Sequence, residues 1–176
     1  MADPFLHTKR LRWRPVQAGD APLYAAVLSD YEVVRMLGSW PWPPDPDAVR
    51  ERLEKWLETK GLLGPIFLGE EMIGGMGVEA TDPGEAEIGY MLARAHWGHG
   101  YATEMGAALI ARAFARPDLR CIRATTWADN PASARVLQKL GFVPDGGGMD
   151  YCKARGEEVA SHAHVLTREA WAARDD

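Results

Sequence analysis

Hydrophobic and polar positions change their spacing along the chain, and each change marks an expected element. Alternating or short apolar stretches predict strands at Thr8 to Arg14, Pro65 to Leu68, Met72 to Val78, residues 85–94, Cys121 to Trp127, and in a final antiparallel pair, from Phe142 onward and from Val159 to Leu166. Helical spacing predicts helices from Asp20 to Leu28, Glu32 to Leu37, Asp45 or Asp47 to about Lys60, Tyr101 to Ala115 and Asn130 to Leu140. With no internal repeat or linker, this order predicts a single α+β domain over residues 1–176, with a mixed, mostly antiparallel sheet flanked by helices.

Short polar residues, glycines and prolines are expected to set the ends of these elements. Asp20 is expected to cap the first helix, and Gly141 to stop the helix that ends at Leu140. Residues 39–47, SWPWPPDPD, contain four prolines, which forbid a helix and favour a stiff, extended loop. Residues 69–71 are expected to form the turn of a hairpin.

The composition narrows the classes of partner. Hydrophobic residues make up 47% of the chain and charged residues 26%, as in ordinary globular proteins. Because 20 Lys and Arg face 25 Asp and Glu, the formal net charge is −5, and we expect no nucleic-acid partner and no anionic-membrane partner. No apolar run approaches the roughly 20 residues of a membrane span, and the first residues show no apolar core of a secretory signal.

Cysteine and histidine usage points to a cytoplasmic protein without a metal centre. Cys121 and Cys152 are too few for a disulfide scaffold and have no CxxC spacing, so we expect both to be reduced. A metal site needs three or four convergent ligands. His162 and His164 would share one strand face, but nothing in the sequence brings further ligands to them, so we expect no metal.

The stretch WGHGYATE, residues 97–104, lies between a strand and a helix. A helix start leaves several N–H groups unbonded and carries partial positive charge, and glycines let an anion approach those groups closely. Gly98, Gly100 and the amides of residues 99–103 therefore form a candidate phosphate cradle. A Walker loop would need Gly-Lys-Ser/Thr, which is absent, and a dinucleotide fingerprint would need Gly or Ala where Thr103 stands. The pyrophosphate of coenzyme A and a glycine turn without a ligand remain as the two alternatives.

A second motif, NPASARVLQKLGF at residues 130–142, follows the next strand. Together the two motifs resemble the acetyl-CoA site of the GNAT acetyltransferase superfamily. The opening stretch TKRLRWRPVQAGDAPLYAAVLSDYEVVRMLG and the segment AEIGYML resemble its ribosomal-protein-alanine acetyltransferase branch, the RimJ/RimL-like proteins. The resemblance covers residues 8–142. It departs from the family at Trp97, where the motif usually has Gln or Arg, and this removes one polar contact to the cofactor.

The resemblance implies the GNAT fold, with acetyl-CoA held between two neighbouring strands. The backbone of the strand from Ile88 to Leu92 would face the pantetheine arm, and Arg135 and Lys139 would reach the adenosine 3′-phosphate. A solvated basic face is the alternative for these two side chains, as an ordinary N-cap is for Asn130. The complete set implied to contact acetyl-CoA is Tyr90, Met91, Leu92, Trp97, Gly98, His99, Gly100, Tyr101, Ala102, Thr103, Asn130, Ser133, Arg135 and Lys139.

The implied reaction is attack of an amine on a thioester, which requires a base for the ammonium proton and a proton donor for the departing thiolate. Many family members place a donor Tyr where this chain has Leu137, so the branch resemblance makes Ser133 the candidate acid and Tyr151 a second donor. Glu87 is the candidate base because a carboxylate beside an apolar wall has a raised pKa, and Asp150 is the alternative base.

The resemblance also places the proline-rich loop at the acceptor pocket. Trp40 and Trp42 are candidates for contacting the acceptor amine, because aromatic faces favour cations; inward packing in a rigid loop is the alternative. We expect an acetyl-CoA-dependent N-acetyltransferase that acts on a protein N-terminal α-amine. A small-molecule amine acceptor (amino acid, polyamine or antibiotic) and a non-catalytic acyl-CoA-binding module are the alternatives. The sequence leaves the oligomeric state open, a homodimer included.

Overall fold

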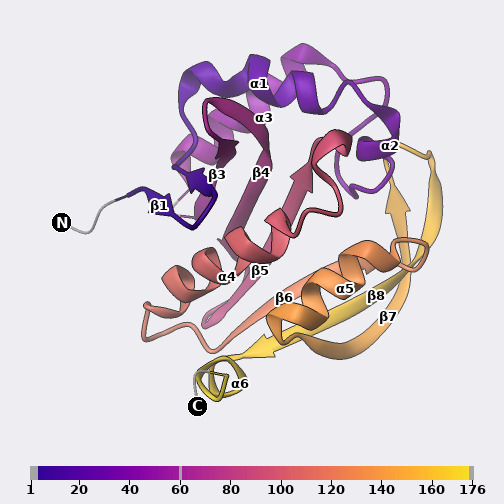
Figure 1. The fold of residues 1–176 in the computed structure, drawn as a ribbon. Coiled ribbons are helices and arrows are strands. Elements are labelled where there is room, and N and C mark those ends of the chain that lie inside the picture. The colour runs from indigo at the N-terminus through magenta and orange to yellow at the C-terminus, as the bar shows by residue number, and fades with distance from the viewer. Residues whose placement is uncertain (1–3, 60, 175–176) are drawn as a thin grey trace.

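The computed structural model describes residues 4–59 and 61–174, and it confirms the α+β class and the predicted order of the main elements (Figure 1). The strands are β1 (Leu6–His7), β2 (Leu11–Trp13), β3 (Leu62–Leu68), β4 (Glu71–Ala80), β5 (Glu85–Leu92), β6 (Cys121–Trp127), β7 (Val143–Cys152) and β8 (Glu157–Thr167). The α-helices are α1 (Ala21–Val27), α2 (Tyr31–Val34), α3 (Pro46–Glu58), α4 (Tyr101–Phe114), α5 (Pro131–Leu140) and α6 (Arg168–Ala172).

These strands form one eight-stranded sheet in the order β1-β2-β3-β4-β5-β6-β8-β7. Among the described strands, β5 and β6 make the parallel pair and the other neighbours are antiparallel, as predicted. The β5–β6 pairing spans only Glu85 to Glu87 on β5, after which the two strands diverge (Figure 1). The centre of the sheet is therefore open beyond Glu87.

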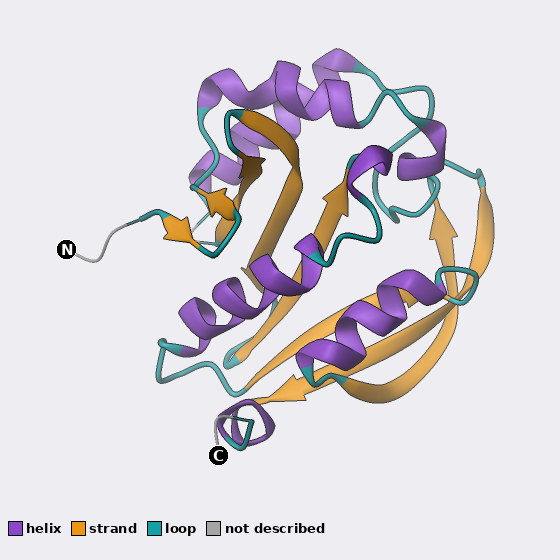
Figure 2. Cartoon of the chain, viewed as in Figure 1, coloured by secondary structure: helices purple, strands orange, loops and turns teal. Residues whose placement is uncertain are grey.

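Helices cover both faces of the sheet (Figure 2). An apolar cluster lies on each face, because side chains alternate between the two faces along each strand. On β4, Met76 and Val78 pack into the larger cluster, which α4 and α5 cover. The smaller cluster joins α1, α2, α3 and Met91 of β5. Gly75 lies on this second face, where an added Cβ would come within 2.9 Å of the Tyr24 ring, so its glycine lets α1 pack closely.

The N-terminal strand differs from the prediction. Residues Thr8 to Arg14 do not form one strand, because the chain turns between β1 and β2, which pair with each other. The Thr8 hydroxyl accepts a hydrogen bond from the Leu11 N–H in this turn. The Thr8 hydroxyl and the Arg10 N–H also donate to Glu104, at 2.6 and 2.9 Å, so contacts with α4 hold the turn.

Asp20 is the N-cap residue of α1, as predicted, but its carboxylate makes no cap hydrogen bond to that helix. It instead accepts two hydrogen bonds from Arg14, at 2.7 and 2.8 Å, and one from the Gln17 N–H. The Asp20 carboxylate therefore serves the ion pair with Arg14 and the capping box of the short 3₁₀ turn, residues 18–20, that precedes α1.

Other boundaries follow local chemistry. Asp45, one of the two predicted caps, accepts from the Asp47 N–H at the start of α3, while Lys60 lies outside the described residues. The strand predicted over residues 85–94 ends at Leu92 and a 3₁₀ turn follows. Helix α6 was not predicted; Thr167 caps it. No helix within the described ranges is long and apolar enough to cross a membrane.

Candidate active site

A cleft of about 1300 Å³ opens where β5 and β6 separate. Its lining comes from both strands, from the start of α4 and of α5, and from the segment around α1 to α3. Gly89 of β5 lies in this cleft, and a Cβ at that position would meet nothing within 4 Å. A sheet that opens between two strands leaves backbone donors and acceptors free to pair with an extended ligand.

The glycine-rich loop has the backbone that an anion cradle requires. Gly98 and Gly100 have φ of 77° and 79°, a region that residues with a side chain rarely adopt. Gly100 is the N-cap of α4, and because glycine has no side chain, no cap hydrogen bond forms. No N-cap side chain therefore occupies the first N–H groups of this 14-residue helix. Gly98, Gly100, Tyr101, Ala102 and Thr103 all line the cleft.

Side chains around this loop hold it in place. Tyr101 packs beneath the Arg10 guanidinium, whose central carbon lies 4.5 Å from the ring centroid, and Arg10 also donates from Nε to Glu104. Burial would raise the pKa of Glu104, but the hydrogen bonds from Thr8 and Arg10 outweigh it and hold this pKa below its usual value. Trp97 donates from Nε1 to the Leu92 carbonyl at 2.8 Å and lines the cleft.

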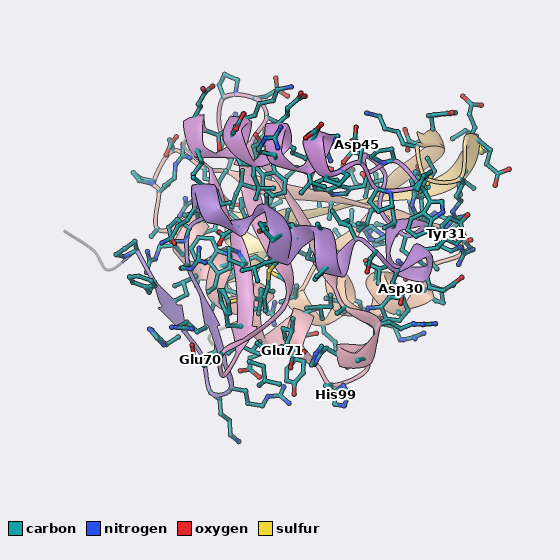
Figure 3. All side chains as sticks on the ribbon, turned by 90° about the horizontal axis from the view of Figure 1, so that it is seen from above. Asp30, Tyr31, Asp45, Glu70, Glu71 and His99 are labelled. Atoms are coloured by element: carbon teal, nitrogen blue, oxygen red, sulfur yellow. The ribbon has the colours of Figure 1, made fainter. Side chains whose placement is uncertain are left out.

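His99 is the one residue of the predicted cradle whose side chain lies outside the cleft lining. Its ring stacks on Tyr101, with centroids 5.5 Å apart, and Figure 3 shows it at the periphery of the molecule. Any contribution of His99 to an anion site therefore comes from its backbone.

The start of α5 brings two predicted residues, Asn130 and Ser133, to the cleft beside Tyr90 of β5. Asn130 caps the helix, accepting from the Ser133 N–H at 3.2 Å, and its side-chain nitrogen donates to no described residue. The Ser133 hydroxyl lies 2.7 Å from the Tyr90 hydroxyl of β5. Burial raises the pKa of Tyr90 to about 12, against the smaller effect of the bond to Ser133, so this hydroxyl keeps its proton at neutral pH.

The outer face of α5 carries cations and its inner face an aliphatic residue. Arg135 and Lys139 are exposed at the rim of the cleft, and neither forms an ion pair with a described residue. Leu137, at the position of the family's donor Tyr, is fully buried. On the α5 side, the mouth of the cleft therefore carries positive charge. Inside the cleft, this helix contributes the Ser133 hydroxyl.

Glu87 stands where the sheet begins to open, directly opposite Glu79 of β4. Both carboxylates line the cleft, and neither forms an ion pair within the described ranges. The Glu87 side chain is exposed in the open cleft, but the surrounding protein still removes part of its contact with solvent. This partial burial raises the pKa of Glu87, and repulsion from Glu79 raises it further.

The alternative acid and base lie on β7, at the end of the cleft. The Asp150 carboxylate accepts a hydrogen bond from the Ser161 hydroxyl. Tyr151 is 59% exposed and lines the rim. Both residues reach the cleft, but they are more open to solvent than the Tyr90–Ser133 pair.

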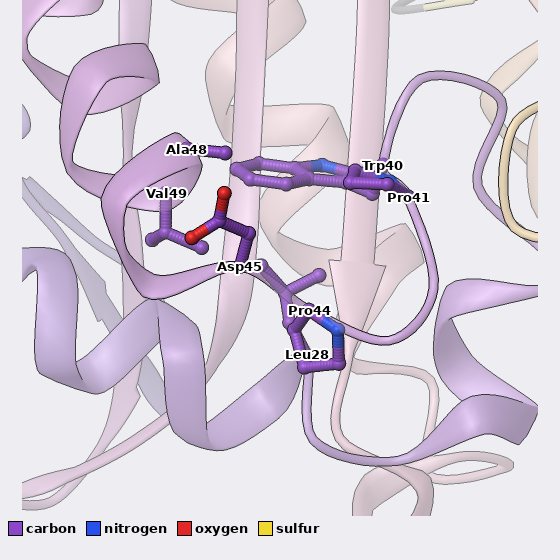
Figure 4. Close-up of a pocket in the computed structure, with 7 residues that line it drawn as sticks. All are labelled: Leu28, Trp40, Pro41, Pro44, Asp45, Ala48 and Val49. Atoms are coloured by element: carbon purple, nitrogen blue, oxygen red, sulfur yellow. The ribbon is translucent and has the colours of Figure 1, made fainter.

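The two tryptophans of the proline-rich loop have different positions. Trp40 is 8% exposed and lines the cleft, while its ring packs at the start of α3, above Asp45 and next to Ala48 (Figure 4). The gap beneath the ring has a volume of only about 10 Å³. Trp42 lies outside the cleft lining and packs on Tyr31, with ring centroids 5.2 Å apart. Of the predicted acceptor contacts, only Trp40 faces the cleft.

Comparison with known families decides the identity of the fold. The model of the acetyltransferase (GNAT) domain matches residues 10–143, which include β5, the glycine loop, α4 and α5. The chain belongs to the GNAT acetyltransferase family. The GNAT fold and N-acetyltransferase activity predicted from the two motifs are thereby confirmed.

Relatives of this GNAT chain match it over nearly its whole length. An uncharacterized N-acetyltransferase of Bacillus licheniformis, p20, is 32% identical, with 95% of this chain and 98% of the relative covered. The ribosomal L7/L12 α-N-protein acetyltransferase RimL, in complex with coenzyme A, superposes with a TM-score of 0.82 at 20% identity, covering 95% of this chain and 98% of RimL. The ribosomal-protein-S5-alanine acetyltransferase of Vibrio fischeri gives 0.82 at 19% identity, covering 96% and 99%. At these identities the two structures establish a shared fold.

The polar groups of the GNAT site that the sequence did not single out include the Glu79 carboxylate and the Arg52 guanidinium. Tyr90 was predicted to contact the cofactor, but its hydroxyl was not expected beside Ser133. Glu79 was recognisable as the cross-strand partner of Glu87 once the hairpin register was known. The Tyr90–Ser133 contact joins residues 43 positions apart, and no local pattern predicts it.

Proposed function

We propose that this GNAT enzyme transfers the acetyl group of acetyl-CoA to an α-amine, with a protein N-terminal α-amine as the primary acceptor. The observation that carries the proposal is the alignment of two features in one cleft. An unpaired strand edge on β5 runs toward a glycine-led helix start on α4. This combination suits a ligand with an extended amide-bearing arm and a pyrophosphate.

The residues present fit acetyl-CoA. The N–H groups of residues 98–103 would hold the pyrophosphate, with Gly98 and Gly100 leaving room for its oxygens. The backbone of Tyr90, Met91 and Leu92 would pair with the pantetheine arm, and the free side-chain nitrogen of Asn130 would donate to it. Arg135 and Lys139 would bind the 3′-phosphate, since both stand unpaired at the rim of the cleft.

Glu87 is the base in this proposal. When bound, acetyl-CoA supplies a thioester whose carbon–sulfur bond breaks as the acceptor nitrogen bonds to the acetyl carbon. The nitrogen must first lose a proton, and a carboxylate with a raised pKa accepts protons near neutral pH better than an ordinary one. Asp150 is less suited because its carboxylate already accepts from Ser161.

Ser133 is the proton donor for the departing thiolate, and Tyr90 positions it. The Tyr90 hydroxyl is protonated at neutral pH and can donate a hydrogen bond to the Ser133 oxygen 2.7 Å away. As the Ser133 proton passes to sulfur, the Ser133 oxygen would take a proton back from solvent in the open cleft. A serine that is hydrogen-bonded to a tyrosine can thus take the role of the family's donor Tyr, whose position is occupied here by the buried Leu137. Tyr151, exposed at the rim, is the less shielded donor.

We expect the Ser133→Ala variant to lower kcat about ten-fold or more while the Kd for acetyl-CoA stays nearly unchanged, because the hydroxyl acts on the leaving group. Tyr90→Phe should give a smaller loss of the same kind, since Phe keeps the ring and removes only the hydroxyl. Steady-state kinetics and calorimetry check both variants. Wild-type kcat in Ser133→Ala would remove Ser133 as the acid.

The acceptor is tested by mass spectrometry of products. Purified enzyme and acetyl-CoA are incubated with peptides that begin with Ala or Ser, and in parallel with amino acids, polyamines and aminoglycosides. The proposal predicts one acetyl group per peptide, on the α-amine. Acetylation of the small amines alone would overturn the protein acceptor, and binding of acetyl-CoA without any product would identify a non-catalytic module.

A further inference from the structure

Arg52 of α3 is a half-buried cation on the cleft wall with no carboxylate partner among the described residues. Its Nη atoms donate to the hydroxyl and the carbonyl of Ser39, at 3.0 and 2.9 Å. Its central carbon lies 4.1 Å from the centroid of the Trp40 ring. Burial lowers the pKa of Arg52, and no neighbouring acid offsets that effect.

Two other partly covered arginines each have a carboxylate partner. Arg14 is paired with Asp20, and Arg155 with Asp129. A guanidinium has five N–H donors, and neutral partners leave its charge uncompensated. The face of the Trp40 ring attracts the guanidinium but carries no net negative charge, so the charge of Arg52 remains available to an anion. Arg168 also has only backbone carbonyls as hydrogen-bond partners, but Arg52 lines the cleft, so an anion that enters the cleft can reach it.

The surroundings hold the Arg52 guanidinium firmly. Trp40 meets Trp56 edge-on, with centroids 6.0 Å apart, and Trp56 meets Tyr24 at 5.6 Å. These rings form a continuous wall that belongs to the smaller apolar cluster. A fixed, planar guanidinium is suited to two parallel hydrogen bonds with a carboxylate.

The phosphates of acetyl-CoA do not account for Arg52. The glycine loop precedes α4, and α4 and α5 cover the face of the larger cluster. Arg52 stands with α1 and α3 at the smaller cluster, on the face where Gly75 and Glu87 point. This is the side from which an acceptor would reach Glu87.

The acceptor side of the cleft thus carries two carboxylates and one guanidinium, none of which forms an ion pair with a described residue. Glu79 and Glu87 lie on adjacent strands, and Arg52 is on the wall. We propose that the acceptor is an α-amino compound that also carries a carboxylate, with its amine at Glu87 and its carboxylate bound by Arg52. The assignment rests on the proposed acetyl transfer. The carboxylate belongs either to a free amino acid or to an acidic side chain near a peptide N-terminus.

The test uses reaction products, because an acetylated amine no longer titrates and only the carboxylate then varies. N-acetyl amino acids are compared with their C-terminal amides, and N-acetyl-Ala-Glu-amide with N-acetyl-Ala-Gln-amide. Binding to protein saturated with CoA is measured by calorimetry. In one of the two series, we expect the compound with the carboxylate to bind about ten-fold tighter or more than its matched amide. A charge-assisted pair of hydrogen bonds contributes an affinity difference of this size. The series that shows the preference identifies the source of the carboxylate.

Variants assign that preference to Arg52. Arg52→Gln should abolish it, and Arg52→Lys should keep part of it because the charge remains and the fork is lost. Arg50→Gln is the matched control, since Arg50 is on the same helix, is exposed and pairs with Asp47. Equal binding of carboxylates and amides to the wild type, or a preference that survives in Arg52→Gln, would overturn the assignment.

The two proposals fail in different ways. Absence of CoA binding, measured first in the same calorimeter, would contradict the proposed function. CoA binding without any bound product, or with equal product affinities, would contradict only the role of Arg52. Unchanged thermal unfolding of Arg52→Gln would show that the loss of preference comes from the missing guanidinium.

Discussion

Replacing Gly100 with glutamate is expected to weaken acetyl-CoA binding by about a hundred-fold or more. Gly100 is the N-cap of α4, and an added Cβ there has only the Arg10 guanidinium nearby, at 3.7 Å, so the space above it is open for a ligand. A carboxylate in that space would repel the pyrophosphate, and like charges brought together in a binding site cost several kcal/mol. Calorimetric titration measures the loss directly.

The control is Gly100→Ala, which carries the same backbone strain without the charge. Gly100 has φ of 79°, where a side chain costs about 1–2 kcal/mol, so both variants should lower the melting temperature. Gly100→Ala should keep the affinity for acetyl-CoA within about ten-fold. If Gly100→Glu bound acetyl-CoA as tightly as Gly100→Ala, the pyrophosphate would have to lie elsewhere.

The second large effect is expected at Glu87. Glu87→Gln should lower kcat/KM by about a hundred-fold, the usual range for losing a positioned base. Because burial and Glu79 raise the pKa of Glu87, the wild-type rate should rise with pH through a range above that of an ordinary carboxyl group. The base acts in its deprotonated form, so this rise should vanish in Glu87→Gln.

Glu79→Gln is the matched variant for the pH profile. It removes the negative charge that faces Glu87 across the strand pair, so the pKa of Glu87 should fall and the rising limb should move to lower pH. The maximal rate should change little by comparison. A Glu87→Gln profile parallel to the wild type would assign the proton to another group, with Asp150 as the next candidate.

The sequence predicted the elements whose ends depend on local chemistry. Helix α4 begins one residue after Gly100 and keeps its apolar face buried, as its spacing requires. Two of the departures from the predictions depend on distant contacts. The turn between β1 and β2 is held by Glu104, 94 residues from Arg10, and α6 follows Thr167 while Arg168 donates to carbonyls of residues 114–119. No window of sequence contains such pairs.

The site shows the same division. The glycine loop and the N-cap at Asn130 could be read from their motifs, because backbone conformation and capping are local properties. Arg52 could not, since an arginine on an amphipathic helix usually faces solvent. Its place four residues before Trp56 was the available signal, because that spacing puts both side chains on one helix face. The bonds to Ser39 that fix it appear only in the fold.

Calorimetric titration of the wild-type protein with acetyl-CoA, with NADH as the comparison, tests the central claim most directly. The open β5 edge and the glycine-led start of α4 predict one acetyl-CoA per chain with micromolar affinity and no binding of NADH. Failure to bind acetyl-CoA would mean that the loop at Gly98 and Gly100 only starts a helix. The roles assigned to Glu87 and Ser133 would then fall with it.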